Sequence, residues 1–180
     1  MCIRDRLLYG GYSTISLGYA GLYECVKYMT GKSHTDPAAT PFALDIMHHL
    51  NDACAKWKAE TDIDFSLYGT PLESTTYKFA KCLQKRFGII PGVTDREYYT
   101  NSFHVPVYYP ISAFEKIARE APYHELTNGG HISYIELDGD PTQNLEAFEA
   151  VVRAMKEAGI GYGAINHPID RDPVCGYTGT

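Results

Sequence analysis

The chain has 180 residues, of which 44% are hydrophobic and 21% charged, and its formal net charge is −6 at pH 7. This length suffices for one domain with a sizeable core, and the negative charge argues against binding to nucleic acid. The sequence contains no run of about 18 apolar residues that would predict a membrane span, and its amino terminus lacks the apolar core of a signal peptide. Five scattered cysteines favour reduced thiols and a cytoplasmic location over a disulfide framework.

Stretches with strand and helix character alternate along the chain. Gly21 separates a β-branched stretch from a helical one, and Gly88 and Gly159 end two further helices. This alternation predicts an α/β fold with mostly parallel strands. After the first strand and helix, the predicted elements are a helix over 42–58, a strand over 63–68, a helix over 71–87, a short helix over 112–120, a strand over 129–137, a helix over 140–158 and a strand over 160–166.

Helical spacing of apolar residues predicts which helix faces are buried. The same spacing predicts that the cysteines within helices are small core residues rather than nucleophiles. The neighbours His48 and His49 are expected at a solvated helix edge. The residues expected to face inward are Ala43, Met47, Cys54 and Trp57 in the first long helix, Leu72, Phe79, Ala80, Cys82, Leu83 and Phe87 in the second, and Leu145, Phe148, Val152 and Met155 in the third, with Cys25 also expected in the core.

The junction between the strand over 63–68 and the next helix has two interpretations. Thr70 and Glu73 form a capping-box pattern with Pro71 at the first helical position, which explains these residues without a ligand. The same turn also suits an anion, because a helix amino terminus has unpaired N–H groups and partial positive charge. In that interpretation Gly69 permits close approach, while Thr70 and Ser74 supply hydroxyl groups.

Two further stretches place an asparagine shortly before a histidine among turn-forming residues. We expect Asn101, His104, Asn128 and His131 to line a polar pocket, with the N–H groups of the intervening Gly129–Gly130 exposed near a ligand. The alternatives are a simple Asn-Gly-Gly turn, or two histidine metal ligands for which a third has no recognisable spacing.

Cys175 belongs to a Cys-Gly-aromatic pattern that is typical of one knuckle of a zinc ribbon. A knuckle has a second cysteine three residues earlier, where this sequence has Asp172. Cys175 alone is not a metal site, so zinc binding would require two more cysteines beyond Thr180.

Five stretches, in this order, resemble the anaerobic (class III) ribonucleoside-triphosphate reductase family. They are "ISLGYAGLYE", "FSLYGTPLEST", "TNSFHVPVYYPISAFEKI", "LTNGGHISYIEL" and "AINHPIDRDPVCGYTG", and the resemblance covers roughly residues 10–180. It implies the ten-stranded α/β barrel of the glycyl-radical enzymes, of which this chain would be the later part. The implied organisation is a non-native or scar segment over 1–9, barrel over 10–166, and the truncated start of a zinc-ribbon-like region over 167–180.

The resemblance also implies a reaction, the conversion of ribonucleoside triphosphates to deoxyribonucleoside triphosphates by glycyl and thiyl radicals. Formate or a thiol system would supply the electrons. A radical-SAM activating enzyme, which itself carries S-adenosylmethionine and an iron–sulfur cluster, would install the glycyl radical. Nucleotide effectors and a second copy of the full-length protein are further implied partners.

Residue by residue, the resemblance assigns Gly69, Thr70 and Ser74 to substrate-phosphate binding, with Thr70 and Glu73 as the scaffold cap. Asn101, His104, Asn128, Gly129, Gly130 and His131 are assigned to pocket lining, and Cys175 to one zinc ligand, which Asp172 puts in doubt. The glycyl and thiyl residues would lie outside this chain, so the fragment alone is expected to be inactive. The alternatives are another glycyl-radical enzyme, acting on a small acid or alcohol, and a non-catalytic nucleotide- or phosphate-binding α/β module.

Overall fold

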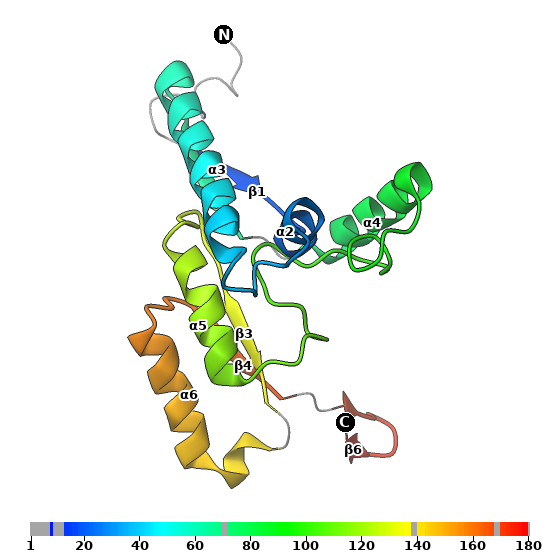
Figure 1. Ribbon diagram of the computed structural model, residues 1–180. Coiled ribbons are helices and arrows are strands. Elements are labelled where there is room, and N and C mark those ends of the chain that lie inside the picture. Colours follow the sequence, from blue (N-terminus) through cyan, green and yellow to red (C-terminus); the bar gives the residue numbers. More distant parts are fainter. Residues whose placement is uncertain (1–7, 9–12, 70–71, 138–139, 168–169, 180) are drawn as a thin grey trace. The chain divides into compact units, whose positions relative to one another are not determined.

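The computed structural model describes residue 8 and residues 13–69, 72–137, 140–167 and 170–179, with helices and strands alternating along the chain (Figure 1). It divides into two compact units, Met1–Tyr109 with Pro122–His131, and Pro110–Ala121 with Ile132–Thr180. None of the helices in the described ranges has the length and apolar character needed to cross a membrane.

The first unit is built around two parallel strands. Strands β1 (Thr14–Gly18) and β2 (Asp64–Tyr68) pair in register, with Ile15 opposite Phe65. Helices α2 (Leu22–Thr30) and α3 (Thr40–Thr61) connect them, as parallel strands require. Helix α4 (Glu73–Phe87) follows β2. The predicted strand–helix–helix–strand–helix order is therefore confirmed.

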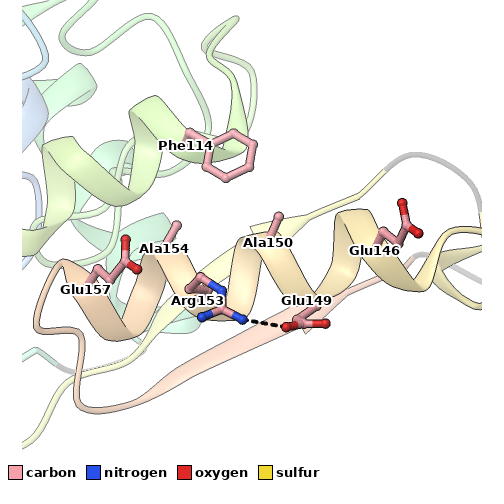
Figure 2. A pocket seen from close by; sticks show the side chains of 7 residues that line it. All are labelled: Phe114, Glu146, Glu149, Ala150, Arg153, Ala154 and Glu157. Carbon is pink, nitrogen blue, oxygen red and sulfur yellow. Dashed lines mark hydrogen bonds and ion pairs between the residues drawn. The ribbon is translucent and has the colours of Figure 1, made fainter.

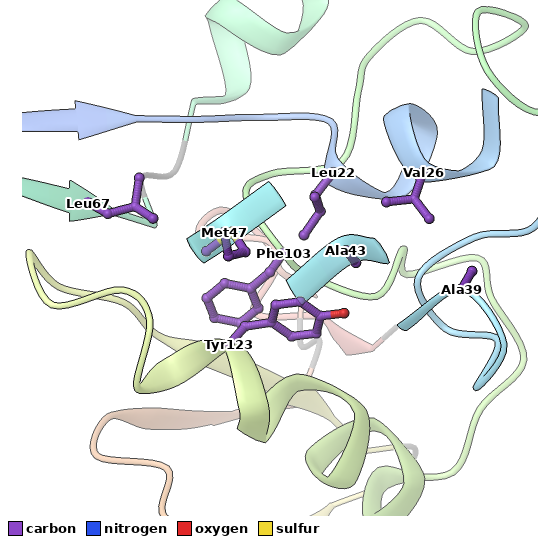
Figure 3. Packing of buried hydrophobic residues seen from close by; sticks show 8 residues of the cluster. All are labelled: Leu22, Val26, Ala39, Ala43, Met47, Leu67, Phe103 and Tyr123. Atoms are coloured by element: carbon purple, nitrogen blue, oxygen red, sulfur yellow. The ribbon is translucent and has the colours of Figure 1, made fainter. Parts of the chain in front are cut away.

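The core of the first unit joins α2 and α3 to a loop and to the end of α5 (Ala113–His124) (Figure 3). Phe103 and Tyr123 stack with ring centroids 5.7 Å apart and an interplanar angle of 11°. The cluster consists of Leu22, Val26, Ala39, Ala43, Met47, Leu67, Phe103 and Tyr123. Its α3 members lie at the positions predicted from helical spacing.

The second unit contains another parallel pair, β3 (Ser133–Glu136) and β4 (Gly163–Asn166), linked by the 3-10 turn η1 (Pro141–Gln143) and helix α6 (Leu145–Glu157). Two short antiparallel strands, β5 (Asp170–Arg171) and β6 (Thr178–Gly179), were not predicted. The described strands form three two-stranded sheets and do not close into a barrel. The α/β class and the parallel pairing are confirmed, whereas the partial ten-stranded barrel stays a prediction.

The ends of three helices differ from their predicted positions. Helix α4 begins at Glu73 with Leu72 as the N-cap residue, while Thr70 and Pro71, the predicted cap and first residue, lie outside the described residues. Helix α5 continues through Pro122 to His124 because Tyr123 is fully buried in the first core. The predicted start at Asp140 is a 3-10 turn capped by Asp140, and Asn144 caps α6 through the Ala147 N–H.

Several residues predicted to be buried are exposed. The apolar sides of α4 and α6 extend beyond what the described residues cover. Helical spacing identifies an apolar face but not the partner that covers it, so it overestimated burial on these helices. The exposed residues are Trp57, Phe79, Phe87, Leu145, Phe148 and Val152, together with the thiols of Cys25 and Cys82. Cys54, Ala80 and Met155 are buried as predicted.

Candidate functional site

The predicted site residues Gly69, Asn101 and Gly130 meet at the carboxyl ends of β1 and β2. Ala20, just after β1, forms an isolated antiparallel bridge with Asn101. The Asn101 Oδ1 atom accepts the Leu72 N–H at 3.1 Å, and the Gly69 N–H donates to the Gly130 carbonyl at 2.9 Å. These bonds tie the segments that follow both strands to two distant loops.

The Asn128–Gly130 segment lies along β2 and occupies its hydrogen-bonding groups. The Leu67 N–H donates to the Asn128 Oδ1 atom at 3.0 Å, and the Gly129 N–H donates to the Leu67 carbonyl at 2.7 Å. The Gly130 N–H donates to Thr127 O. The expectation that these glycines expose N–H groups to a ligand is therefore wrong, because both N–H groups have acceptors within the chain.

Side chains of the same chain lie close to Gly69, on the face where a ligand was expected. A Cβ atom at Gly69 would lie 3.3 Å from Thr127 Cγ2 and 3.5 Å from Phe103 Cε1. Its small size thus serves packing. Ser74 is exposed in the first turn of α4, where the amino-terminal N–H groups have no intrahelical acceptor. The phosphate interpretation then depends mainly on this helix turn.

Both predicted histidines join an aromatic cluster around Phe103. The His104 ring stacks on Phe103 at 5.1 Å and 12°, and its Nδ1 atom lies 3.0 Å from both the Asn101 carbonyl and Ser102 Oγ. His131 meets His124 edge-to-face at 4.1 Å. Burial, together with His131 and His104, lowers the pKa of His124 to about 4. The cluster therefore contains a neutral imidazole at physiological pH.

The sequence patterns did not predict Ser102 and two histidines as members of this region. Ser102 is fully buried with φ at 39°, a left-handed conformation that non-glycine residues seldom adopt away from functional or tightly constrained sites. His34 lies before the helix predicted over 42–58, and His124 lies beyond the predicted end of its helix. No spacing in the sequence distinguishes these two histidines from solvated ones.

His34 provides a pH-dependent test of this cluster. Its Nε2–H donates to the Phe103 carbonyl at 2.7 Å, and its buried Nδ1 atom has no hydrogen-bond partner among the described residues. Burial, only partly offset by that bond, lowers the pKa of His34 to about 4. Because the unfolded chain binds this proton from about pH 6.5 downward, His34 stabilises the fold fully above that pH, and the contribution is lost toward pH 4. We expect a loss of about 3 kcal/mol in the free energy of unfolding.

Denaturant unfolding at several pH values between 7 and 4 measures this loss. In the His34→Gln variant the dependence on pH is expected to be shallower. His48→Gln, on the exposed side of α3, is the matched control. Equal pH dependence in the wild type and His34→Gln would contradict the assignment.

Cys175 lies in the turn between β5 and β6 and is exposed. The Asp172 Oδ1 atom accepts the N–H groups of Val174 and Cys175 at 2.7 and 3.2 Å, and these bonds lower the pKa of the Asp172 carboxyl. In the described ranges, no group of three or more His, Cys, Asp or Glu residues is placed to hold a metal ion. The described residues therefore do not provide a zinc site, and Cys175 stays a predicted single ligand.

The second unit has an open groove of about 390 Å³ between Phe114 and one face of α6 (Figure 2). Glu146, Glu149 and Glu157 line it, and its one cation, Arg153, is paired with Glu149 at 2.6 Å. An acidic lining disfavours phosphate. Of these two regions, the α4 turn in the first unit is the better candidate for an anionic substrate.

Comparison with known proteins identifies relatives over nearly the whole chain. The family model described as anaerobic ribonucleoside-triphosphate reductase matches residues 5–180. The reductase of that name from Enterobacteria phage T4 is 40% identical over 173 residues, which are 96% of this chain and 27% of the relative. Its counterpart from Escherichia coli strain K12 is 40% identical over 177 residues, 97% of this chain and 25% of the relative. The chain thus spans about a quarter of the length of these relatives.

Solved structures of anaerobic ribonucleotide reductase share the fold. The Thermotoga maritima enzyme with glycerol in the active site matches with a TM-score of 0.74 and 22% identity, covering 91% of this chain and 29% of that one. The same enzyme in complex with dATP and CTP matches with a TM-score of 0.72.

Proposed function

Because the chain belongs to the anaerobic ribonucleoside-triphosphate reductase family, we propose that it forms part of the catalytic α/β barrel of such a reductase. The whole protein would convert ribonucleoside triphosphates to deoxyribonucleoside triphosphates, with formate or a thiol system as the electron source. The residues that carry the glycyl and thiyl radicals are assigned outside this chain. Within it, residues 10–166 are assigned to the barrel and residues 167–180 to the start of the zinc-ribbon-like region.

The convergence of predicted site residues at the carboxyl ends of β1 and β2 carries this proposal. In α/β folds ligands bind at the carboxyl ends of parallel strands. Here Asn101 and the Gly69–Gly130 bond fix the backbone on both sides of the turn that leads into α4. We assign the triphosphate to the amino terminus of α4, with Ser74 and Thr70 as hydroxyl donors, although Thr70 lies outside the described residues.

The neighbouring aromatic cluster would form a wall of the substrate pocket. The stacked His104 and Phe103 rings and the T-shaped His131–His124 pair are held by backbone carbonyls, including that of Thr127 for His131 Nδ1 at 2.9 Å. Rings held in this way provide shape and hydrogen bonding to a substrate. Nucleotide effectors, a radical-SAM activating enzyme and a second copy of the full-length protein are the proposed partners.

Replacing Ser74 by alanine in the full-length protein tests the phosphate assignment. Loss of one hydrogen bond to a charged oxygen is expected to weaken ribonucleoside triphosphate binding about tenfold. The melting temperature should not change, because Ser74 is exposed. Thr61→Val, which removes a hydroxyl beyond the amino end of β2, is the control and should bind normally.

Two results would count against these assignments separately. Unchanged affinity in the Ser74→Ala variant would exclude Ser74 from the phosphate site. A full-length protein that binds nucleotide, but forms no deoxyribonucleotide in an anaerobic assay with its activating enzyme and electron donor, would favour the non-catalytic binding module.

A further inference from the structure

A second site, separate from the β2–α4 turn, lies between α2 and α4. The first unit has a cavity of about 410 Å³ there, which falls within the size range of small-molecule sites. Tyr28, Phe79 and Tyr99 are among its mostly apolar lining residues, and Cys25 and Cys82 also line it. A cavity with apolar walls and few polar groups is typical of a site for a small, largely apolar ligand.

The acidic group in this cavity is Glu24, which is 95% buried on an otherwise apolar side of α2. Its Oε1 atom accepts the Thr100 N–H at 3.0 Å and the Thr100 hydroxyl at 2.8 Å. Its Oε2 atom is buried and has no hydrogen-bond partner among the described residues. Hydrogen bonds therefore reach one of the two carboxylate oxygen atoms. Burying the other without a partner costs free energy of folding.

The Gly21 position on the cavity wall lies next to that oxygen. Gly21, which also lines the cavity, has φ at 78°, and a Cβ atom there would lie 3.6 Å from Oε2. The Gly21 N–H donates to the Thr100 carbonyl at 2.7 Å, so the same residue that holds Oε1 also fixes this wall. Burial raises the pKa of the Glu24 carboxyl despite its bonds to Thr100 and the positive charge of Lys27, and a further cation would oppose that effect.

We propose that this cavity binds a small primary amine with an apolar or aromatic body, whose ammonium group pairs with Glu24 Oε2. The ammonium group supplies both the missing donor and the opposite charge. The aromatic side chains of Tyr28, Phe79 and Tyr99 provide apolar contact and faces that attract a cation. This site is independent of the proposed phosphate site, which takes an anion at the amino terminus of α4.

Titration of the full-length protein with phenethylamine tests the proposal. Binding is expected, and Glu24→Gln, which keeps the shape and removes the charge, should weaken it tenfold or more. Phenethyl alcohol, which has the same body without the charge, should bind wild type and Glu24→Gln with similar affinity. Glu125→Gln, at an exposed position, is the control substitution and should leave amine binding unchanged.

Thiol alkylation gives a readout on the wild-type protein that does not depend on a variant folding. Phenethylamine should slow the reaction of iodoacetamide with Cys25 and Cys82, but not with the exposed Cys175, which does not line the cavity. The proposal is overturned by equal amine affinity of wild type and folded Glu24→Gln, or by no protection of the two thiols. It is also overturned if the full-length protein shows neither binding nor alkylation, because another part of the polypeptide then fills the cavity.

Discussion

Replacing Gly129 by alanine is expected to destabilise the first unit by about 4 kcal/mol. A Cβ atom at this position would lie 2.6 Å from Ser66 Oγ and 2.7 Å from the Leu67 carbonyl oxygen. The second atom belongs to the backbone of β2 and cannot rotate away. The loop must therefore move, and both the Gly129–Leu67 and Leu67–Asn128 hydrogen bonds lengthen or break.

Trp57 makes this effect directly measurable. It is the single tryptophan of the chain, and its ring lies 5.6 Å from that of Phe65 in β2. Urea unfolding followed by its fluorescence should show a lower midpoint in Gly129→Ala. Gly161→Ala is the matched control, because no atom lies within 4 Å of the added methyl group. Similar midpoints for both variants would show that the loop does not depend on this contact.

Replacing Lys116 by methionine is expected to destabilise the second unit by about 3–5 kcal/mol. The Lys116 ammonium group is almost fully buried and donates to the Tyr134 carbonyl and to Glu136 Oε2 at 3.2 Å. It also lies 4.0 Å from Oε1 of the fully buried Glu120. Removing the cation takes the ammonium group away from the buried Glu120 carboxyl, whose Oε2 atom accepts the Ser133 hydroxyl at 2.6 Å.

A double variant separates charge from packing. Adding Glu120→Gln to Lys116→Met removes the carboxylate together with the ammonium group and should restore more than half of the lost stability. Lys56→Met is the control, because its ion pair with Glu60 is exposed and should contribute less than about 1 kcal/mol. Circular dichroism during urea unfolding measures all three variants. No recovery in the double variant would assign the loss to packing alone.

The elements that could be predicted from the sequence are those with a strong local signal. The β2 strand and the α3 helix follow from apolar spacing alone. The short helix predicted from residue 112 is preceded by a Ser112–Glu115 capping box, in which the Glu115 N–H donates to Ser112 Oγ at 3.3 Å. Helix α5 continues past its predicted end because burial of Tyr123 outweighs the cost of Pro122.

The sequence patterns indicated residues for the candidate site but not their contacts, and the binding roles of these residues stay a prediction. Gly69, Asn101 and Gly130 do meet, although the turn patterns could not reveal that the glycine N–H groups bond to the chain itself. Glu24 was overlooked, although one carboxylate within the apolar stretch of α2 is a visible signal for a buried polar group. The surroundings of its Oε2 atom depend on tertiary contacts, which no local sequence pattern encodes.

The loop alongside β2 also determines how the first sheet can be extended. Asn128 Oδ1 and the Gly129 N–H occupy the Leu67 groups on the side of β2 away from β1. An incoming strand cannot pair with β2 at Leu67 without displacing this loop. Among the described strands β1 pairs only with β2. The loop thus covers β2 at Leu67 and protects this edge of the sheet from edge-to-edge association.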